Sequence, residues 1–429
     1  MRRLIPDFIA EKYKQNKTSG SFEAAIMFID ISGFTAMTQE LMKTGKEGAE
    51  VLSEIINNIF TPAINTIYVH KGFISTFAGD AFTAVFISAG NEDKTENILK
   101  AAVKIKKIFN LIGEVSTKFG NFKLSVKIGL SYGTTDWGII WGSKFSTYFF
   151  KGEAIIKSID AQSAAELNEI ICEESIVSNV QKSDELKLTK KEDNHFILSS
   201  YEPAGKSGFV SIRENQEDYD NVEQKNFIPQ SVFKHKSAGE YRGVISCFVA
   251  FNQCEGWQTA VSRIIDSAID YGGYFNKIDF YSGGAYALIL FGAPIAKENL
   301  NIRACEFALT IQNPALTSDI PDFKTKIGLT YETVFAGFIG SDKRCEYSVL
   351  GMSVNLAARF MVHAQGRDIL IDKYLYRNTE SNFESRFWHE YLFKGFKDEI
   401  PVFRLFAKTS DKSSSMYQGE MVGREEETV

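Results

Sequence analysis

The sequence predicts an α+β protein that consists of two similar domains, each with the strand–helix–strand–strand–helix–strand order of a ferredoxin-like fold. The first observation is an internal repeat, since KIGLSY at residues 127–132 recurs as KIGLTY at residues 326–331, 199 positions later. At the same offset, YFFKG at residues 148–152 is matched by YSVLG at residues 347–351. The second observation is that short apolar runs and long amphipathic segments alternate in the same order in both halves.

Each expected element has its own pattern in the sequence. In the first half, the apolar run at residues 26–30 predicts a strand, and the amphipathic segment at residues 46–68 predicts a long helix. A strand pair at 72–87, a helix at 94–113, a strand at 127–132 and a helix at 152–167 follow. The second half predicts the same order, with a strand at 246–250, a helix at 256–271, a strand pair at 274–290, a helix at 299–312, a strand at 326–331 and a helix at 353–363.

These elements divide the chain into five parts. Residues 1–20 form an N-terminal segment, residues 21–204 the first domain and residues 239–408 the second domain. Residues 205–238 are polar and rich in turn-forming residues, which predicts a linker. Residues 409–429 begin with a serine-rich polar stretch and predict a flexible tail.

Composition and charge restrict the partners and the location that we expect. A net charge of −6 gives no reason to expect nucleic acid as a partner, because proteins that bind nucleic acid usually carry a basic surface. The five cysteines have no metal-ligand spacing and no secretion signal precedes them, so reduced thiols in a cytoplasmic protein are expected. The longest apolar stretch, residues 285–296, is interrupted by Gly292 and Pro294 and is too short to span a bilayer. We therefore expect a soluble protein without a transmembrane segment.

The repeat is uneven at the residues that carry chemistry. A pseudo-twofold pair of such domains would form two related clefts. One cleft would hold the full set of polar and charged residues, and the other would lack them. Each half keeps polar residues that the other lacks: Asp30 stands opposite Ala250, Asp80 opposite Tyr281, Lys277 opposite Thr76, Asn355 opposite Ile156 and Arg359 opposite Asp160. A purely structural repeat would not require these complementary losses, so the pattern favours one active site shared between the two domains.

Three motifs in order resemble the class III nucleotidyl cyclases, and most closely the tandem catalytic domains of soluble adenylyl cyclases. FIDISGFT at residues 28–35 looks like the first metal motif, FAGD at 77–80 like the second, and VNLAAR at 354–359 like the ribose and phosphate helix. The resemblance covers roughly residues 20–405 and implies two cyclase domains that pair within one chain as an intramolecular heterodimer, so that a monomer suffices.

The C-terminal sequence MVGREEE at residues 421–427 is similar to the start of the P-loop ATPase module that often follows cyclase domains. This similarity predicts that the chain is a catalytic fragment of a longer protein. An ordinary acidic tail is the alternative.

Asp30 and Asp80 are the expected metal ligands. Two carboxylates suit two Mg²⁺ ions, which prefer hard oxygen ligands, with Mn²⁺ or Ca²⁺ as alternatives. One ion would lower the pKa of the ribose 3′-hydroxyl, and the other would neutralise the triphosphate and the departing charge. The resemblance adds Ile31 to the metal ligands. The alternative is structural, with Asp30 capping a helix after a strand and Asp80 serving a turn.

Asn355 and Arg359 are four residues apart, so they share one face of a helix. The resemblance implies that Asn355 orients the ribose and that Arg359 stabilises charge on the α-phosphate in the transition state. A planar fork of donors suits that oxygen geometry better than an ammonium does. The alternative is a surface arginine on an alanine-rich helix.

The remaining candidates would bind the purine and the phosphates. By resemblance, the Lys277 ammonium would donate to purine N1 and the Ser348 hydroxyl would face the 6-amino group of adenine; solvated or structural roles are the alternatives. Lys127 stands where a triphosphate-contacting lysine is found, although Lys326 at the repeated position leaves a structural role open. Main-chain N–H groups at the start of a helix could also cradle the β- and γ-phosphates, at Ser32, Gly33, Phe34 and Thr35.

The expected function is that of an adenylyl cyclase, which converts ATP to 3′,5′-cyclic AMP and pyrophosphate by two-metal catalysis. The alternatives are a guanylyl or dual-specificity cyclase and a catalytically silent nucleotide-binding regulatory module. Bicarbonate-stimulated soluble cyclases hold a lysine and an arginine in the second cleft. Here those places correspond to Thr76 and Ile159, so we expect no activation by bicarbonate through that cleft.

Overall fold

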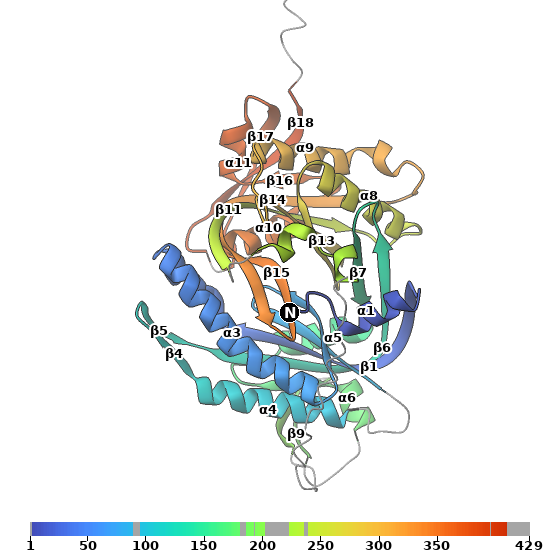
Figure 1. Cartoon of the computed structure of the whole chain (residues 1–429), viewed down its shortest axis with the longest axis vertical. Coiled ribbons are helices and arrows are strands. Elements are labelled where there is room, and N and C mark those ends of the chain that lie inside the picture. Colours follow the sequence, from blue (N-terminus) through green and yellow to red (C-terminus); the bar gives the residue numbers. More distant parts are fainter. Residues whose placement is uncertain are drawn as a thin grey trace, which may run out of the picture.

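The computed structural model describes residues 2–88, 95–180, 186–192, 194–201, 223–235, 239–394 and 396–409. Most of the predicted linker, residues 205–222 and 236–238, lies outside these ranges, as does the predicted tail from residue 410 onward. The described residues form two similar units of sheet and helices, with the N-terminal unit in blue and green and the C-terminal unit in yellow to red (Figure 1).

The first unit holds a mixed sheet with the strand order β2-β3-β1-β6-β8-β10-β9, and β7 pairs with β6 outside this path. Its elements are α1 (Asp7–Lys14), β1 (Ser19–Ser32), α2 (Phe34–Met42), α3 (Lys46–Val69), β2 (Phe73–Ala78), β3 (Ala81–Ile87), α4 (Glu96–Ile112), β4 (Glu114–Thr117), β5 (Gly120–Lys123), β6 (Ser125–Trp141), β7 (Ser146–Lys151), α5 (Glu153–Ser163), β8 (Ile170–Glu173), α6 (Glu174–Asn179), β9 (Leu186–Glu192) and β10 (His195–Tyr201).

The second unit repeats this order as β12-β13-β11-β14-β16-β18-β17, with β15 paired to β14. A 3-10 turn at Gln224–Asn226 and α7 (Gln230–Phe233) precede it. Its elements are β11 (Gly239–Phe251), α8 (Trp257–Asp270), β12 (Tyr274–Tyr281), β13 (Gly284–Phe291), α9 (Leu300–Gln312), a 3-10 turn at Pro314–Thr317, β14 (Thr325–Ser341), β15 (Arg344–Leu350), α10 (Met352–His363), β16 (Ile369–Ile371), α11 (Lys373–Thr379), β17 (Phe383–Tyr391) and β18 (Ile400–Lys408).

The ferredoxin-like prediction is confirmed in both units, because the first four strands of each path have the order that this fold requires. The predicted helices and strand pairs are also present. The helix expected at 152–167 ends four residues early, at Ser163. A turn ends it, in which Asn168 has a φ of 62° and its side-chain oxygen accepts a hydrogen bond from the Val126 N–H at 3.2 Å.

Both sheets carry helices on two faces. In β1, Met27 and Ile29 belong to the core that includes α3 and α4, while Ile26 faces the opposite core with residues of α1 and α5. On that second face, α5 passes directly over Gly129, where a Cβ atom would lie 2.1 Å from the Ser158 carbonyl oxygen. Gly328 meets α10 in the same way, so both glycines are needed for close helix packing.

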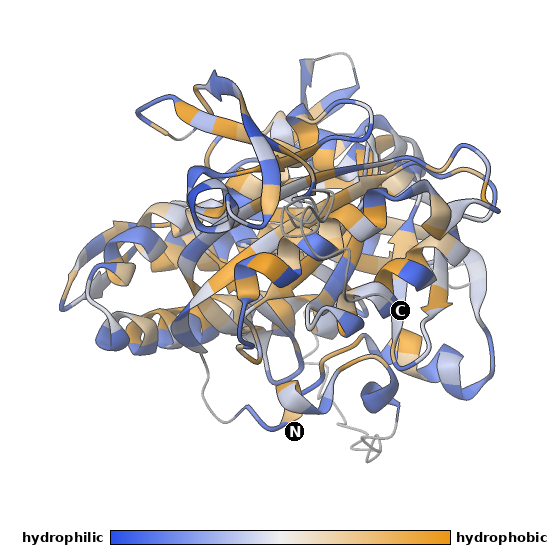
Figure 2. Ribbon diagram, turned by 90° about the horizontal axis from the view of Figure 1, so that it is seen from above, coloured by the Kyte–Doolittle hydropathy of each residue, from blue (hydrophilic) through white to orange (hydrophobic). Residues whose placement is uncertain are grey.

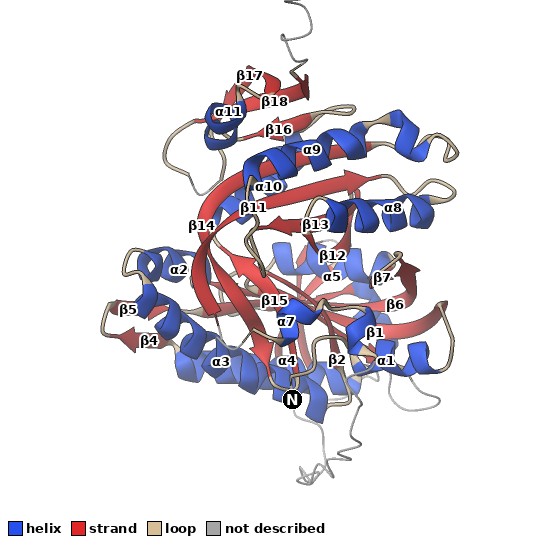
Figure 3. Cartoon of the chain, turned by 45° about the horizontal axis from the view of Figure 1, so that its top comes forward, coloured by secondary structure: helices blue, strands red, loops and turns tan. Residues whose placement is uncertain are grey.

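The two units pack against each other through equivalent elements. Helix α3 packs on β14 and β11, and α8 packs on β6, so each unit lends a helix to the other. Ile339 is buried in the core of the first unit and Ile140 in the core of the second unit. Figure 3 shows α8 and α9 at one end of the molecule and α3 and α4 at the other. This reciprocal packing is the expected pseudo-twofold arrangement.

Apolar residues are concentrated along the central strands, and hydrophilic residues lie mainly at the periphery (Figure 2). In the parts of the chain that the structure describes, no helix combines the length and the apolar character needed to cross a membrane.

Candidate active site

A cavity of about 610 Å³ opens where the two units meet, and residues from both units line it. The first unit contributes the start of α2 and the turn between β2 and β3. The second unit contributes strands β11, β12, β13 and β15, helix α10 and the segment before β18. Seven residues that the sequence analysis singled out line this cavity: Phe34, Thr35, Asp80, Lys277, Ser348, Asn355 and Arg359.

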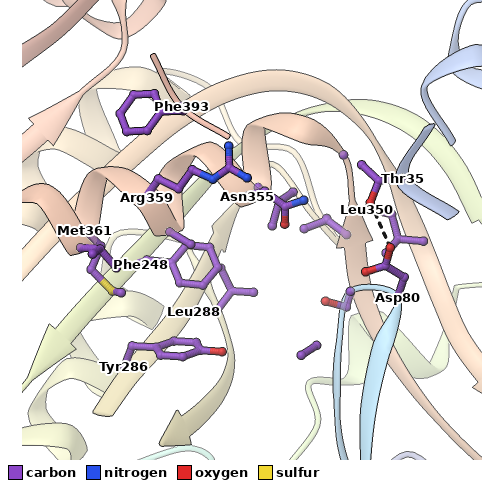
Figure 4. Close-up of a pocket in the computed structure, with 18 of the residues that line it drawn as sticks. Thr35, Asp80, Phe248, Tyr286, Leu288, Leu350, Asn355, Arg359, Met361 and Phe393 are labelled. Carbon is purple, nitrogen blue, oxygen red and sulfur yellow. Dashed lines mark hydrogen bonds between the residues drawn. The ribbon is translucent and has the colours of Figure 1, made fainter. Parts of the chain in front are cut away.

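Asp80 lies in the two-residue turn between β2 and β3, and the side chain points into the cavity (Figure 4). The turn depends on Gly79, whose φ of 69° favours glycine. The hydroxyl of Thr35 donates a hydrogen bond of 3.0 Å to Asp80 Oδ2. Burial, together with the negative charge of Asp30, raises the pKa of Asp80 to about 6.

Asp30 is half-buried near the end of β1, where it stands opposite Ala81 on β3 and Lys127 on β6. Burial raises the pKa of Asp30, while the positive charges of Lys127 and Lys394 act against this rise. Asp30 does not itself line the cavity, and neither do Ile31 and Lys127. Asp30 nevertheless lies beside the turn that carries Asp80, and its negative charge raises the pKa of Asp80. The two aspartates therefore interact electrostatically.

The turn after β1 places the first residues of α2 in the cavity. Gly33 caps the helix with a φ of 92°, and a Cβ atom there would lie 2.3 Å from the Lys123 carbonyl oxygen. Ser32 and Gly33 stay outside the cavity lining, whereas Phe34 and Thr35 belong to it. Free N–H groups at a helix start attract anions, so this turn could hold phosphate oxygens.

Asp30 and Asp80 fit a site for divalent cations. Burial is the main cause of the raised pKa of Asp80, and the negative charge of Asp30 adds to it, so a cation bound beside both carboxylates would offset both costs. Over the ranges that the structure describes, no group of three or more acidic, histidine or cysteine side chains is placed to hold a metal ion. Mg²⁺ commonly takes only one or two protein carboxylates and completes its shell with substrate phosphates and water, so two aspartates are sufficient.

Asn355 and Arg359 project from neighbouring turns of α10 into the cavity (Figure 4). Asn355 is exposed, and its amide is free to reach a ligand. The guanidinium of Arg359 donates a hydrogen bond to the Lys394 carbonyl oxygen and lies 5.7 Å from the ring centroid of Phe396. The segment before β18 therefore holds Arg359 in place across the cavity from Asp80.

Lys277 is buried on β12 and its ammonium group has no hydrogen-bond partner within the described structure. The nitrogen lies 3.8 Å from Glu346 Oε2 and 3.9 Å from Asp279 Oδ2, which are ion-pair distances. A buried ammonium whose N–H groups lack acceptors is costly unless a ligand supplies one. Lys277 is thus positioned to donate to a molecule in the cavity.

Ser348 is buried on β15, and its hydroxyl donates to Asn276 Oδ1 at 3.2 Å. The Asn276 amide in turn donates to the Tyr347 carbonyl oxygen at 2.7 Å. Because this hydroxyl gives its proton to Asn276, its lone pairs are available to accept a hydrogen bond from the cavity side.

The apolar wall of the cavity and the residues that support its polar groups were not predicted from the sequence. The wall comes from strands, from α10 and from the segment that follows β17, and it includes Phe248, Tyr286, Leu288, Met361 and Phe393. Phe248 and Leu288 belong to strands whose apolar pattern is that of an ordinary core, so nothing in the pattern distinguishes them. Asn276 and Lys394 likewise carry no local signal, since their roles depend on distant chain segments.

A second cavity, of about 270 Å³, occupies the equivalent position in the other half of the interface. Thr76 and Ile159 line it among aromatic residues that include Tyr148, Phe150 and Phe227.

The two units differ in the length of one hairpin, since the hairpin of β12 and β13 extends further than that of β2 and β3. Lys277 pairs with Leu288 as Thr76 pairs with Thr83, but Tyr281 then continues the strand where Asp80 forms the turn.

Comparison with known proteins identifies the family. A sequence profile of the adenylate and guanylate cyclase catalytic domain matches residues 17–200 and 261–407, which is most of the chain. The chain belongs to this family. The resemblance to class III nucleotidyl cyclases that the motifs predicted is therefore confirmed, and the repeated units are cyclase catalytic domains.

Curated relatives of this cyclase chain include adenylate cyclase type 10 from two mammals. The protein of Oryctolagus cuniculus is 26% identical over 453 residues, which cover 93% of this chain and 28% of that protein. The protein of Homo sapiens is 25% identical over 435 residues, which cover 90% of this chain and 27% of that protein. The chain thus spans little more than a quarter of the length of these relatives.

Among solved structures, a class III adenylyl cyclase-like ATP-binding protein from Pseudomonas aeruginosa has a TM-score of 0.56 with 12% sequence identity. The likeness covers 88% of this chain and 93% of that one. It therefore extends over both cyclase units and shows that their tandem arrangement has a precedent in this fold.

Proposed function

We propose that this chain is the catalytic part of an adenylyl cyclase, which converts ATP to 3′,5′-cyclic AMP and pyrophosphate at the 610 Å³ cavity. One observation carries the proposal. The acidic residues come from the first unit, the amide and guanidinium come from the second unit, and the cavity between them is large enough for a nucleotide.

Asp30 and Asp80 would hold two divalent cations, with the main-chain oxygen of Ile31 as a further ligand. When bound, Mg²⁺ ions would activate the 3′-hydroxyl and neutralise charge on the phosphates. The raised pKa of Asp80 supports this role, because a bound cation would offset the cost of burying the carboxylate and the repulsion from Asp30. Mn²⁺ and Ca²⁺ use the same hard oxygen ligands and remain alternatives.

The triphosphate would lie along the first unit. The N–H groups at Ser32, Gly33, Phe34 and Thr35 are at or near the start of α2, where the helix dipole favours negative charge. Lys127 stands opposite Asp30 on the neighbouring strand and would add a positive charge for the β- and γ-phosphates. These groups would orient pyrophosphate as the leaving group.

The ribose and the α-phosphate would face α10. Asn355 would donate to or accept from ribose oxygens and so direct the 3′-hydroxyl at the α-phosphorus. Arg359 would stabilise the charge that develops on the α-phosphate oxygens as the 3′-oxygen attacks. Its guanidinium is held by the Lys394 carbonyl oxygen, so little reorganisation is needed during the reaction.

The base would lie between the apolar wall and the pair Lys277 and Ser348. Adenine has an acceptor at N1, which suits the ammonium of Lys277, and its 6-amino group is a donor for the Ser348 lone pairs. Guanine reverses both groups, since its N1 carries a hydrogen and its 6-position is an acceptor. This match favours ATP over GTP, although a single serine leaves dual specificity as a second candidate.

The intramolecular pairing of the two units would make a monomer sufficient for activity, with ATP as the small-molecule partner and no nucleic acid bound. Residues 21–204 and 239–408 would be the two cyclase domains, with residues 205–238 as the linker. The chain would act in the cytoplasm.

The test is a product assay on the purified chain with ATP or GTP, in Mg²⁺ and in Mn²⁺. We expect cyclic AMP and pyrophosphate, with a higher kcat/KM for ATP than for GTP. The double variant Lys277→Glu, Ser348→Cys should reverse this preference, because it exchanges the donor and acceptor at the base. The exposed pair Lys324→Glu, Ser318→Cys is the matched control and should leave the preference unchanged. Nucleotide binding without cyclisation in either metal would instead favour the silent regulatory module.

A further inference from the structure

Arg344 is a fully buried arginine at the start of β15, where the second unit meets the first. The guanidinium donates to the main-chain oxygens of Leu4 at 3.0 Å, Ser75 at 3.3 Å and Ile74 at 3.4 Å. It also donates to the Tyr148 hydroxyl at 2.8 Å. One side chain of the second unit therefore binds the N-terminal segment, strand β2 and strand β7 of the first unit.

Glu346 connects this arginine to the purine lysine. Its Oε1 atom lies 2.6 Å from Arg344 Nη2, and its Oε2 atom lies 3.8 Å from Lys277 Nζ. Residues 344, 346 and 348 alternate along β15, so their side chains point to the same face of the strand. The interface arginine, the connecting carboxylate and the base-facing Ser348 thus form one row.

The position of Lys277 depends on its carboxylate neighbours, because its ammonium has no hydrogen bond in the described structure. Two carboxylates face it, Glu346 and Asp279. Glu346 is itself fixed by Arg344, which is held by several acceptors and cannot move without losing them. A change at the interface is therefore transmitted to the lysine through a short chain of charged contacts.

We propose that Arg344 and Glu346 are positioning residues that make recognition of the purine depend on docking of the first unit and the N-terminal segment. This inference rests on the proposed function, in which Lys277 donates to purine N1. Arg344 fixes the carboxylate of Glu346, and Glu346 keeps the ammonium of Lys277 where it can donate to N1 of the base. Neither side chain touches the substrate.

The test compares kcat/KM for ATP with that for 1-deaza-ATP, in which a C–H group replaces N1. The quotient, which is kcat/KM for ATP divided by kcat/KM for 1-deaza-ATP, measures the hydrogen bond from Lys277 independently of any general loss of activity. The variants are Glu346→Gln, which keeps the shape of the side chain, Arg344→Met, and Tyr148→Phe, which removes one acceptor of Arg344. The control is Arg404→Met on β18, where the arginine pairs with Asp368 far from the interface between the units.

We expect the quotient to fall by about fivefold or more in Glu346→Gln and Arg344→Met, and by less in Tyr148→Phe. Arg404→Met should keep the quotient of the parent. If Arg344→Met does not fold, the other two variants decide the outcome.

A parent that prefers ATP, with variants that lose activity on both nucleotides equally, would overturn the inference and leave the proposed function intact. A parent that uses both nucleotides equally well would instead refute the role of Lys277 in the proposed function. A fall of the quotient in Arg404→Met would also overturn the inference, since the quotient would then report general damage.

Discussion

The single residue Asp80 carries a buried carboxylate whose charge is costly until a cation binds. Its pKa is raised from 3.8 to about 6 by burial and by Asp30. The folded, metal-free protein therefore binds the proton of Asp80 more tightly than the unfolded chain does. This contribution to stability is fully present below pH 4 and is lost as the pH rises through about 6, which amounts to about 3 kcal/mol.

We expect Asp80→Asn to raise the melting temperature of the metal-free protein at pH 7.5, because it removes the buried charge. The same variant should lose the further stabilisation that Mg²⁺ gives to the parent, since one of the two carboxylate ligands is gone. Calorimetry with and without Mg²⁺ measures both effects. The exposed Asp342→Asn is the control and should behave as the parent. An equal response of Asp80→Asn and the parent to Mg²⁺ would speak against metal binding at Asp80.

The polar and charged residues of the sequence motifs were predictable as site residues. The residues that hold them in place through tertiary contacts were not. The spacing of Asn355 and Arg359 places both on one helix face, and the structure shows both at the cavity. By contrast, Asn276, Glu346 and Lys394 act through contacts with segments that are distant in the chain. Residue pattern and spacing in the sequence indicate local geometry only, so they cannot predict contacts between segments that meet only after folding.

At the scale of the element, β6 and β14 are repeated strands that carry a lysine at the same place. Lys127 stands opposite Asp30, whereas Lys326 stands opposite Ala250. We expect Lys127→Ala to raise KM for ATP several-fold with a smaller change in kcat, because it removes a charge near the triphosphate. Lys326→Ala is the matched control from the other unit and should leave both constants near those of the parent. Equal effects of the two variants would support a structural role that the repeat shares.

The helices and the central strands were predictable because their periodicity is strong, as in α3, which begins at the predicted Lys46 and ends one residue beyond the predicted end. The hairpin of β4 and β5 and the outer strands β8–β10 and β16–β18 were not anticipated. These strands are short or have exposed faces, so their apolar pattern is weak. The longer β12–β13 hairpin was also unforeseen, although its length decides that Tyr281 occupies a strand and not a turn.

At the scale of the whole molecule, the two interface cavities differ in what they can bind. The second cavity is lined mainly by aromatic and aliphatic residues, and Lys277, which also reaches it, faces Glu346 and Asp279. An anion bound there would lose its hydration and meet the carboxylates of Glu346 and Asp279 beside Lys277, so little net positive charge would replace the lost water. We therefore expect no activation by bicarbonate. Cyclase activity titrated with bicarbonate at constant pH and ionic strength measures this, and saturable stimulation of several-fold would contradict it.

The proposed cyclase has one reaction centre, to which both units contribute residues. The most direct measurement is the rate of cyclic AMP formation by the parent, by Asp30→Ala in the first unit and by Arg359→Ala in the second unit. We predict that each single variant loses at least about 100-fold in kcat while both remain folded by calorimetry. A variant in either unit that cyclises ATP at the parental rate would contradict a composite site.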